Sequence, residues 1–225
     1  MRGTVARIDA RQRGPVMRAY HPRFARYGFR PSSLLLIDSF AYVRGPRWSE
    51  CFLQQVVEHL FFAGDHAVAI VLGGARVLRG DYERMFAFAG ERYFLGGLRA
   101  VLVVSMGNDL IASTRPMRVA DVDAGDIVSA LGRLRALFSS ARAALVYGGS
   151  GITWGYAPDV SEPYDARVAA ILRSAVFEFD YATSGAAALV GVSPVDAIGH
   201  LSVDDAYASG RLLLVSLRGV FRSRL

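Results

Sequence analysis

Four short runs of apolar residues, separated by segments with helical periodicity, constrain the fold of this chain more than any other feature. Each run is aliphatic and lacks the alternation of polar and apolar residues that marks a half-exposed strand. Such runs are typical of parallel strands that are buried on both faces of a sheet. They occupy residues 33–37, 67–72, 100–104 and 143–147.

The segments between the runs are interpreted as helices because their apolar residues recur at helical spacing. These helices are expected at 50–63, 82–94, 126–138 and 164–175. A fifth strand is expected to begin at 177–180, followed by a terminal helix at 202–217 with Ser202 as its N-cap. Alternating strands and helices predict an α/β fold, a three-layer α/β/α sandwich with a mainly parallel sheet of about five strands.

Charge divides the chain into a basic N-terminal arm, residues 1–31, and one α/β domain, residues 32–225. The arm holds eight arginines and one acidic residue, a net charge of +7, whereas the remainder carries −1. Aromatic and histidine side chains lie between the arginines, at Tyr20, His21, Phe24, Tyr27 and Phe29. This pattern fits an arm that binds nucleic acid or another anionic partner. It also fits an arm that packs over a sheet edge.

Several classes of protein and site are not expected. No apolar run approaches the roughly 18 residues of a membrane span. The basic N-terminus lacks the apolar region of a signal peptide, so we expect an intracellular protein. The lone Cys51 excludes an internal disulfide and argues against a cysteine-based zinc site. Asp121, Asp123 and Asp126 are interpreted as acids at a helix N-terminus rather than as metal ligands, so no metal or cofactor is expected.

Polar residues that could carry chemistry follow the strands in order. Ser39 follows the first run, Gly73 and Gly74 the second, and Asn108 the third, while His200 precedes the last helix. The carboxyl ends of parallel strands meet at one edge of a sheet, where sites of such folds lie. Acyl transfer uses a serine that attacks, a histidine that takes its proton, and N–H donors that stabilise the oxyanion.

This order resembles the four sequence blocks of the SGNH (GDSL) hydrolase superfamily over about residues 33–217. The strongest match is Gly107-Asn108-Asp109 after a hydrophobic strand, followed by His200-Leu201-Ser202 at the start of the last helix. The resemblance implies a flavodoxin-like sheet with the strand order 2-1-3-4-5.

The resemblance also implies roles for individual residues. Ser39 resembles the nucleophile, His200 the general base, and Asp196 the acid that orients the histidine. The residues that resemble the oxyanion donors are Ser39 through its N–H, Gly73 or Gly74, and Asn108. The chain departs from the family at two places. Ile37 stands where the family has glycine, and Asp196 lies four residues before His200 instead of three.

Three functions follow from these observations. The first is a serine hydrolase, of esterase or deacetylase type, that acts on an ester or acetylated small molecule without a cofactor. The second, motivated by the two departures and by the basic arm, is a non-catalytic binding protein of the same fold. The third is a nucleotide-binding protein that uses the glycine-rich segment 148–151, although this segment lacks the spacing and lysine of a P-loop.

Overall fold

A computed structural model describes residues 16–23, 28–39, 51–114, 117–148 and 158–185. The helices of this part of the chain are α1 (Cys51–Phe62), α2 (Asp81–Gly90), α3 (Ala124–Ala136) and α4 (Pro158–Ala175), with single 3-10 turns at Leu95–Gly97 and Asn108–Leu110. The strands are β1 (Arg18–Tyr20), β2 (Ser33–Ile37), β3 (Ala67–Val71), β4 (Ala100–Ser105), β5 (Ile111–Thr114), β6 (Met117–Val119), β7 (Arg142–Tyr147) and β8 (Tyr181–Ser184).

The main sheet has six strands in the order β1-β3-β2-β4-β7-β8. Strands β3, β2, β4, β7 and β8 are parallel, and this part of the sheet has the predicted order 2-1-3-4-5. The α/β prediction is therefore confirmed. The sheet has one strand more than predicted because β1 pairs antiparallel with β3.

The strand β1 lies inside the segment that the sequence assigns to the basic arm. Arg18 pairs with Val71 and Tyr20 with Ala69, so this part of the segment covers the edge of the sheet. The backbone N–H of Arg23 donates to Glu58 on α1 at 2.7 Å. Residues 1–15 and 24–27 of the arm lie outside the described residues.

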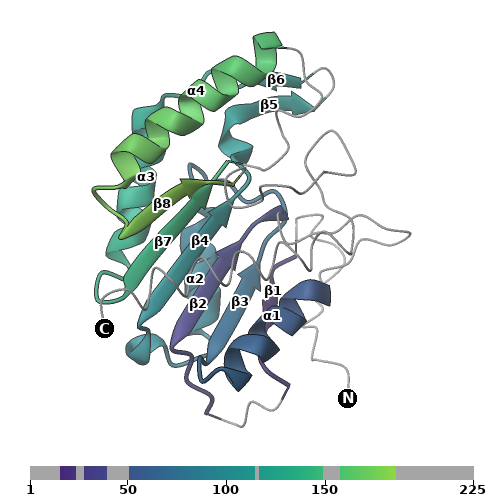
Figure 1. Cartoon of the computed structure of the whole chain (residues 1–225), viewed down its shortest axis with the longest axis vertical. Helices are drawn as coiled ribbons and strands as arrows, with labels where there is room; N and C mark the ends of the chain where they lie inside the picture. Colours follow the sequence, from purple (N-terminus) through teal and green to yellow (C-terminus); the bar gives the residue numbers. More distant parts are fainter. Residues whose placement is uncertain (1–15, 24–27, 40–50, 115–116, 149–157, 186–225) are drawn as a thin grey trace.

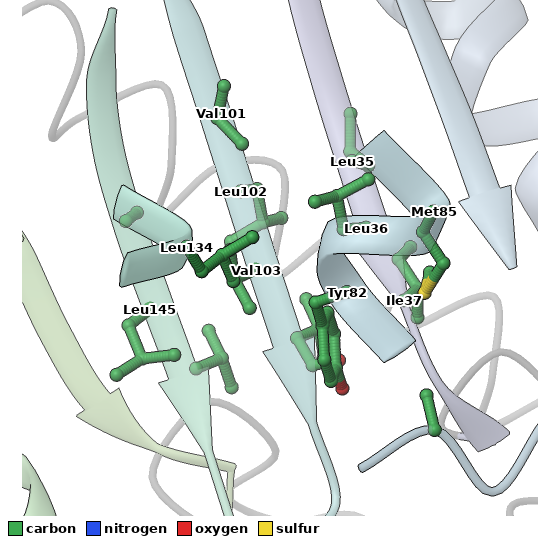
Figure 2. Close-up of a cluster of buried hydrophobic side chains, with 14 of the residues drawn as sticks. Leu35, Leu36, Ile37, Tyr82, Met85, Val101, Leu102, Val103, Leu134 and Leu145 are labelled. Atoms are coloured by element: carbon green, nitrogen blue, oxygen red, sulfur yellow. The ribbon is translucent and has the colours of Figure 1, made fainter. Parts of the chain in front are cut away.

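Helices cover both faces of the sheet. In Figure 1, α1 lies in front of the strands and α2 lies behind them. Figure 2 shows Tyr82 and Met85 of α2 and Leu134 of α3 packed over the aliphatic side chains of β2, β4 and β7. Burial on both faces explains why the strands contain apolar residues at consecutive positions instead of alternating ones.

The structure differs locally from the sequence expectations at the fifth strand, at the helix expected at 82–94, and at the hairpin β5–β6. The fifth strand begins at Tyr181, because residues 176–180 form the turn after α4, in which Phe177 is 88 % exposed and Phe179 packs into the core. The helix expected at 82–94 ends at Gly90, and the chain turns at Leu95–Gly97 before β4. The short hairpin β5–β6 was not predicted, since its strands carry no long apolar run. The terminal helix expected at 202–217 lies outside the described residues.

None of the described helices is long and apolar enough to span a membrane.

Three buried tyrosines lie near the carboxyl ends of the strands and differ in their hydrogen bonding. The Tyr82 hydroxyl donates to the Val104 carbonyl at 2.9 Å, and the Tyr164 hydroxyl donates to the Met106 carbonyl at 2.8 Å. The Tyr147 hydroxyl is fully buried and has no hydrogen-bond partner in the described part of the chain. Burial raises the pKa of Tyr147 well above its usual value, so this group stays neutral.

We predict that Tyr147→Phe stabilises the protein. An unpartnered buried hydroxyl destabilises a fold, so its removal should raise the free energy of unfolding by about 1 kcal/mol. Tyr82→Phe is the matched control, because it removes a hydroxyl that is bonded to a strand carbonyl and should lower the free energy of unfolding by about 1 kcal/mol. Urea unfolding monitored by circular dichroism measures both. Equal losses in the two variants would contradict the prediction.

Helix α2 begins at a buried carboxylate. Asp81 is fully buried, and its Oδ2 accepts the Arg76 backbone N–H at 2.8 Å and the Arg79 guanidinium at 2.6 Å, while Oδ1 accepts from Arg84. Burial alone would raise the pKa of Asp81, but these hydrogen bonds outweigh burial and hold the pKa below 3.8. Asp109 is the contrasting case, because burial raises its pKa above 3.8 although the carboxylate accepts hydrogen bonds from backbone N–H groups, including those of Val77 and Leu78.

We predict that Asp81→Asn and Asp109→Asn change the pH dependence of stability in opposite directions. The pKa of Asp81 is lower in the folded state, so its stabilising effect is present above pH 3.8 and is lost as the pH falls below it. Asp81→Asn should lower the free energy of unfolding by about 2 kcal/mol at pH 7, as is typical of hydrogen bonds to charged groups. This difference from wild type should shrink in acid.

The pKa of Asp109 is higher in the folded state, so its contribution to stability declines as the pH rises above 3.8. The stability of wild type relative to Asp109→Asn should therefore decrease as the pH rises. Denaturant unfolding between pH 3 and pH 7 tests both variants, and parallel slopes for the two would contradict the assignment.

Candidate functional site

The carboxyl ends of β2, β3 and β4 bring together Ser39, Gly73, Gly74 and Asn108. Ile37 at the end of β2 is in register with Val71 of β3 and Val104 of β4. Beyond the strands, the Asp38 N–H donates to the Val104 carbonyl at 3.2 Å, and the Leu72 N–H donates to the Ile37 carbonyl at 3.1 Å. The three loops therefore start side by side. His200 and Asp196 lie outside the described residues.

The side chain of Asn108 connects the other two loops. Its Nδ2 donates to Oδ2 of Asp38 at 2.9 Å and to the carbonyl of Ala75 at 3.1 Å. Gly107 precedes it with a φ of 70°, and a Cβ at Gly107 would overlap the Tyr164 hydroxyl. Glycine is therefore needed at this position both for the backbone conformation and for the close approach of Tyr164.

Asp109 fixes the loop that follows the two glycines. Its carboxylate is buried and accepts the Val77 N–H at 2.9 Å and the Leu78 N–H at 3.0 Å. Asn108 and Asp109 thus tie the end of β4 to the loop after β3 at Ala75, Val77 and Leu78. This makes the Gly-Asn-Asp block a structural connection as well as a candidate site.

The turn at Gly73 and Gly74 offers backbone N–H donors at this edge. The Gly74 carbonyl accepts from Arg79 at 3.0 Å, and the carbonyl of the next residue, Ala75, accepts from Asn108. The N–H groups of Gly73 and Gly74 have no hydrogen-bond partner among the described residues. A Cβ at Gly74 would meet no atom within 4 Å. Backbone N–H groups that have no partner within the described part of the chain are suited to bind an oxyanion.

Ser39 lies against a methionine. Its Oγ donates to Sδ of Met106 at 3.4 Å. The backbone of Met106 is held on both sides, because its N–H donates to Asp38 at 2.6 Å and its carbonyl accepts from Tyr164. Sequence reasoning missed Asp38, Met106 and Tyr164 as parts of this edge. Only Asp38 had a signal, since it directly precedes the candidate nucleophile.

Other candidate residues have structural roles. Asp123 caps α3 by accepting the Gly125 N–H at 2.8 Å, as predicted for an acid at a helix N-terminus. His66 stacks on Phe61 with a centroid distance of 5.5 Å. A Cβ at Gly148 would approach Val168 to 2.9 Å, so this glycine permits close packing of α4. Residues 149–151 of the glycine-rich segment lie outside the described residues.

No family model matches this chain, and no curated protein matches it. Solved structures do match. A catalytic mutant of an acetylxylan esterase from Geobacillus stearothermophilus is 13% identical, with a TM-score of 0.54 over 86% of this chain and 95% of that chain. A family two carbohydrate esterase from Clostridium thermocellum, in complex with cellohexaose, is 11% identical, with a TM-score of 0.55 over 86% of this chain and 65% of that chain. Together with the strand order, these similarities show that the chain has the SGNH-hydrolase fold.

Proposed function

We propose that this protein is a serine hydrolase that cleaves an ester or acetyl group through an acyl-enzyme. The observation that carries the proposal is the meeting of three features at one edge of the parallel sheet: Ser39, Asn108, and the N–H groups of Gly73 and Gly74, which have no partner among the residues that the structure describes. A hydroxyl nucleophile beside several N–H donors is the arrangement that acyl transfer requires. His200 and Asp196 complete the proposed site.

The proposed reaction has two halves. Ser39 Oγ attacks the carbonyl carbon while His200 takes the hydroxyl proton, and the carbonyl oxygen becomes an oxyanion bound by N–H donors. The C–O bond to the leaving alcohol then breaks, and His200 returns the proton to that alcohol. Water attacks the acyl-enzyme by the same route and releases the acid and Ser39. Asp196 orients His200 in both halves.

The substrate class proposed for first tests is an acetyl ester. The structures similar to this chain include an acetylxylan esterase and carbohydrate esterases of family two. Those names describe the other proteins. They support acetylated carbohydrates as candidate substrates, beside short aryl acetates, which report any activated serine.

We predict that Ser39→Ala abolishes aryl acetate hydrolysis and labelling by a fluorophosphonate probe, because no other group forms the acyl-enzyme. His200→Ala should lose about as much activity, since members of a catalytic unit fail together. Asn108→Ala should lose about 100- to 1000-fold in kcat, the range for losing an oxyanion donor, because the Asn108 amide joins Asp38 to the loop that follows the Gly73 and Gly74 N–H groups. A loss in Asp196→Ala as deep as that in His200→Ala would assign the orienting acid.

Ser174→Ala is the matched control for the probe, because Ser174 is an exposed serine on α4. It should label and hydrolyse like wild type. Well-folded wild type that neither labels nor hydrolyses any ester of a panel would refute the hydrolase and leave the non-catalytic binding protein as the better explanation.

The net charge of +7 in residues 1–31 favours a second proposal, that this segment binds nucleic acid or another anionic partner. We predict that affinity for a single-stranded oligonucleotide falls steeply as the salt concentration rises, because phosphate contacts release counterions.

Deletion of residues 1–15 removes four of the arginines and retains β1. It should therefore reduce the dependence of the affinity on salt without loss of the edge strand. Deletion of residues 1–31 should also lower the melting temperature, because β1 pairs with β3. Fluorescence anisotropy across a salt series would contradict this proposal if no salt-dependent binding appeared.

A further inference from the structure

A completely buried carboxylate lies beside the proposed nucleophile. Asp38 follows β2, directly precedes Ser39, and has 0% of its surface exposed. A buried carboxylate destabilises a fold unless hydrogen bonds compensate for its lost hydration. Oδ2 of Asp38 has two such bonds, from the Met106 N–H at 2.6 Å and from Nδ2 of Asn108 at 2.9 Å.

These bonds continue to the third loop. The Asn108 amide has two hydrogens on Nδ2, and its second acceptor is the Ala75 carbonyl at 3.1 Å. Asp38, Asn108 and Ala75 thus form a chain of hydrogen bonds across the ends of β2, β4 and β3. Ala75 directly follows Gly74, so the position of the Gly73-Gly74 turn depends on these hydrogen bonds.

We propose that Asp38 is a positioning residue that holds Asn108 and the Gly73 and Gly74 turn in place relative to Ser39. This inference rests on the proposed hydrolase function. In this proposal Asp38 acts through Asn108. Hydrogen bonds to a carboxylate are shorter and stronger than bonds to a neutral acceptor. The Asp38 carboxyl group therefore holds the asparagine amide in one orientation.

The same residue also fixes the environment of the nucleophile. The Met106 N–H bond to Asp38 and the Tyr164 bond to the Met106 carbonyl hold the residue whose Sδ contacts Ser39 Oγ. Removal of the Asp38 carboxylate should therefore free the Met106 N–H, while the Tyr164 hydroxyl still holds the Met106 carbonyl, so the effect on catalysis passes mainly through Asn108. Such a change affects turnover more than substrate binding.

The test is a double-mutant cycle on aryl acetate hydrolysis with Asp38→Ala, Asn108→Ala and the double variant. Residues that act through one another give non-additive effects. We expect Asp38→Ala to lower kcat by about 30-fold or more, with a smaller change in KM, within the range for a misplaced oxyanion donor. In the Asn108→Ala background, the same change should lower kcat by less than about 3-fold. A loss of kcat in the double variant equal to the product of the two single losses would show that the residues act independently and would overturn the proposal.

Asp38→Asn keeps one neutral acceptor oxygen and serves if Asp38→Ala does not fold. It should retain part of the activity, with about a 10-fold loss in kcat that disappears in the Asn108→Ala background. The matched control is Asp180→Ala. The Asp180 carboxylate also accepts a backbone N–H, that of Ala143 at 2.7 Å, but it does so at the opposite end of the sheet. This variant should lose stability with kcat unchanged.

Hydrogen exchange of the Met106 amide provides a readout apart from catalysis. It should accelerate at least about 10-fold in Asp38→Ala, because its acceptor is gone, and stay unchanged in Asp180→Ala. Unchanged exchange in folded Asp38→Ala would overturn the positioning role. An inactive wild type would refute the hydrolase proposal, whereas an active wild type with multiplied losses would refute the role of Asp38 alone.

Discussion

The parallel pairing of β2 with both β3 and β4 is the constraint on which the rest of the structure depends. The three strands are in register from Ser33 to Ile37, so their loops leave the sheet at the same level. A helix returns the chain between successive strands, as parallel connections require. Apolar residues stabilise the middle of these strands. The loop residues just beyond the strand ends lie close to one another, as the bonds between Asp38 and the loop after β4 show. Polar groups that could take part in a reaction are therefore held at the carboxyl ends of strands whose middle is a packed core.

Buried polar groups at that edge are stabilised by hydrogen bonds between loops. Asp38 and Asp109 each accept backbone N–H groups from another loop, and Asn108 donates to both of its neighbouring loops. Each bond compensates for lost hydration and joins segments far apart in sequence. The result is a connected network, in which the loss of one member leaves others unsatisfied. Rigid donors of this kind suit a site that must bind a developing charge.

Strand β1 lies beside β3 at one lateral end of the sheet, where β3 would otherwise be the outermost strand. A strand edge with unpaired N–H and carbonyl groups invites pairing with other chains. Pairing of Arg18–Tyr20 with β3 closes this edge. The arginine-rich segment therefore combines a structural role near Tyr20 with a net charge that suits an anionic partner.

The sequence by itself determined the fold class and much of the order of elements. The apolar runs at 33–37, 67–72, 100–104 and 143–147 predicted four of the strands, because continuous burial leaves a pattern that needs no tertiary information. The same pattern could not predict β1, whose three residues carry no apolar run and form a strand only by pairing with β3. It also placed the fifth strand too early, since the turn after α4 contains the apolar residues Val176 and Phe177.

For the candidate site, sequence order brought Ser39, Gly73, Gly74 and Asn108 to the ends of strands. Only the tertiary structure decided how they are held. Met106 and Ala75 have no distinguishing local pattern, and Asp38 is marked only by its place before Ser39. The roles of all three depend on hydrogen bonds between residues 33 to 70 positions apart. The spacing of apolar residues along one strand or helix is a local property that can be read directly from the sequence. Contacts between loops arise from register and packing, which form only when the whole sheet is assembled.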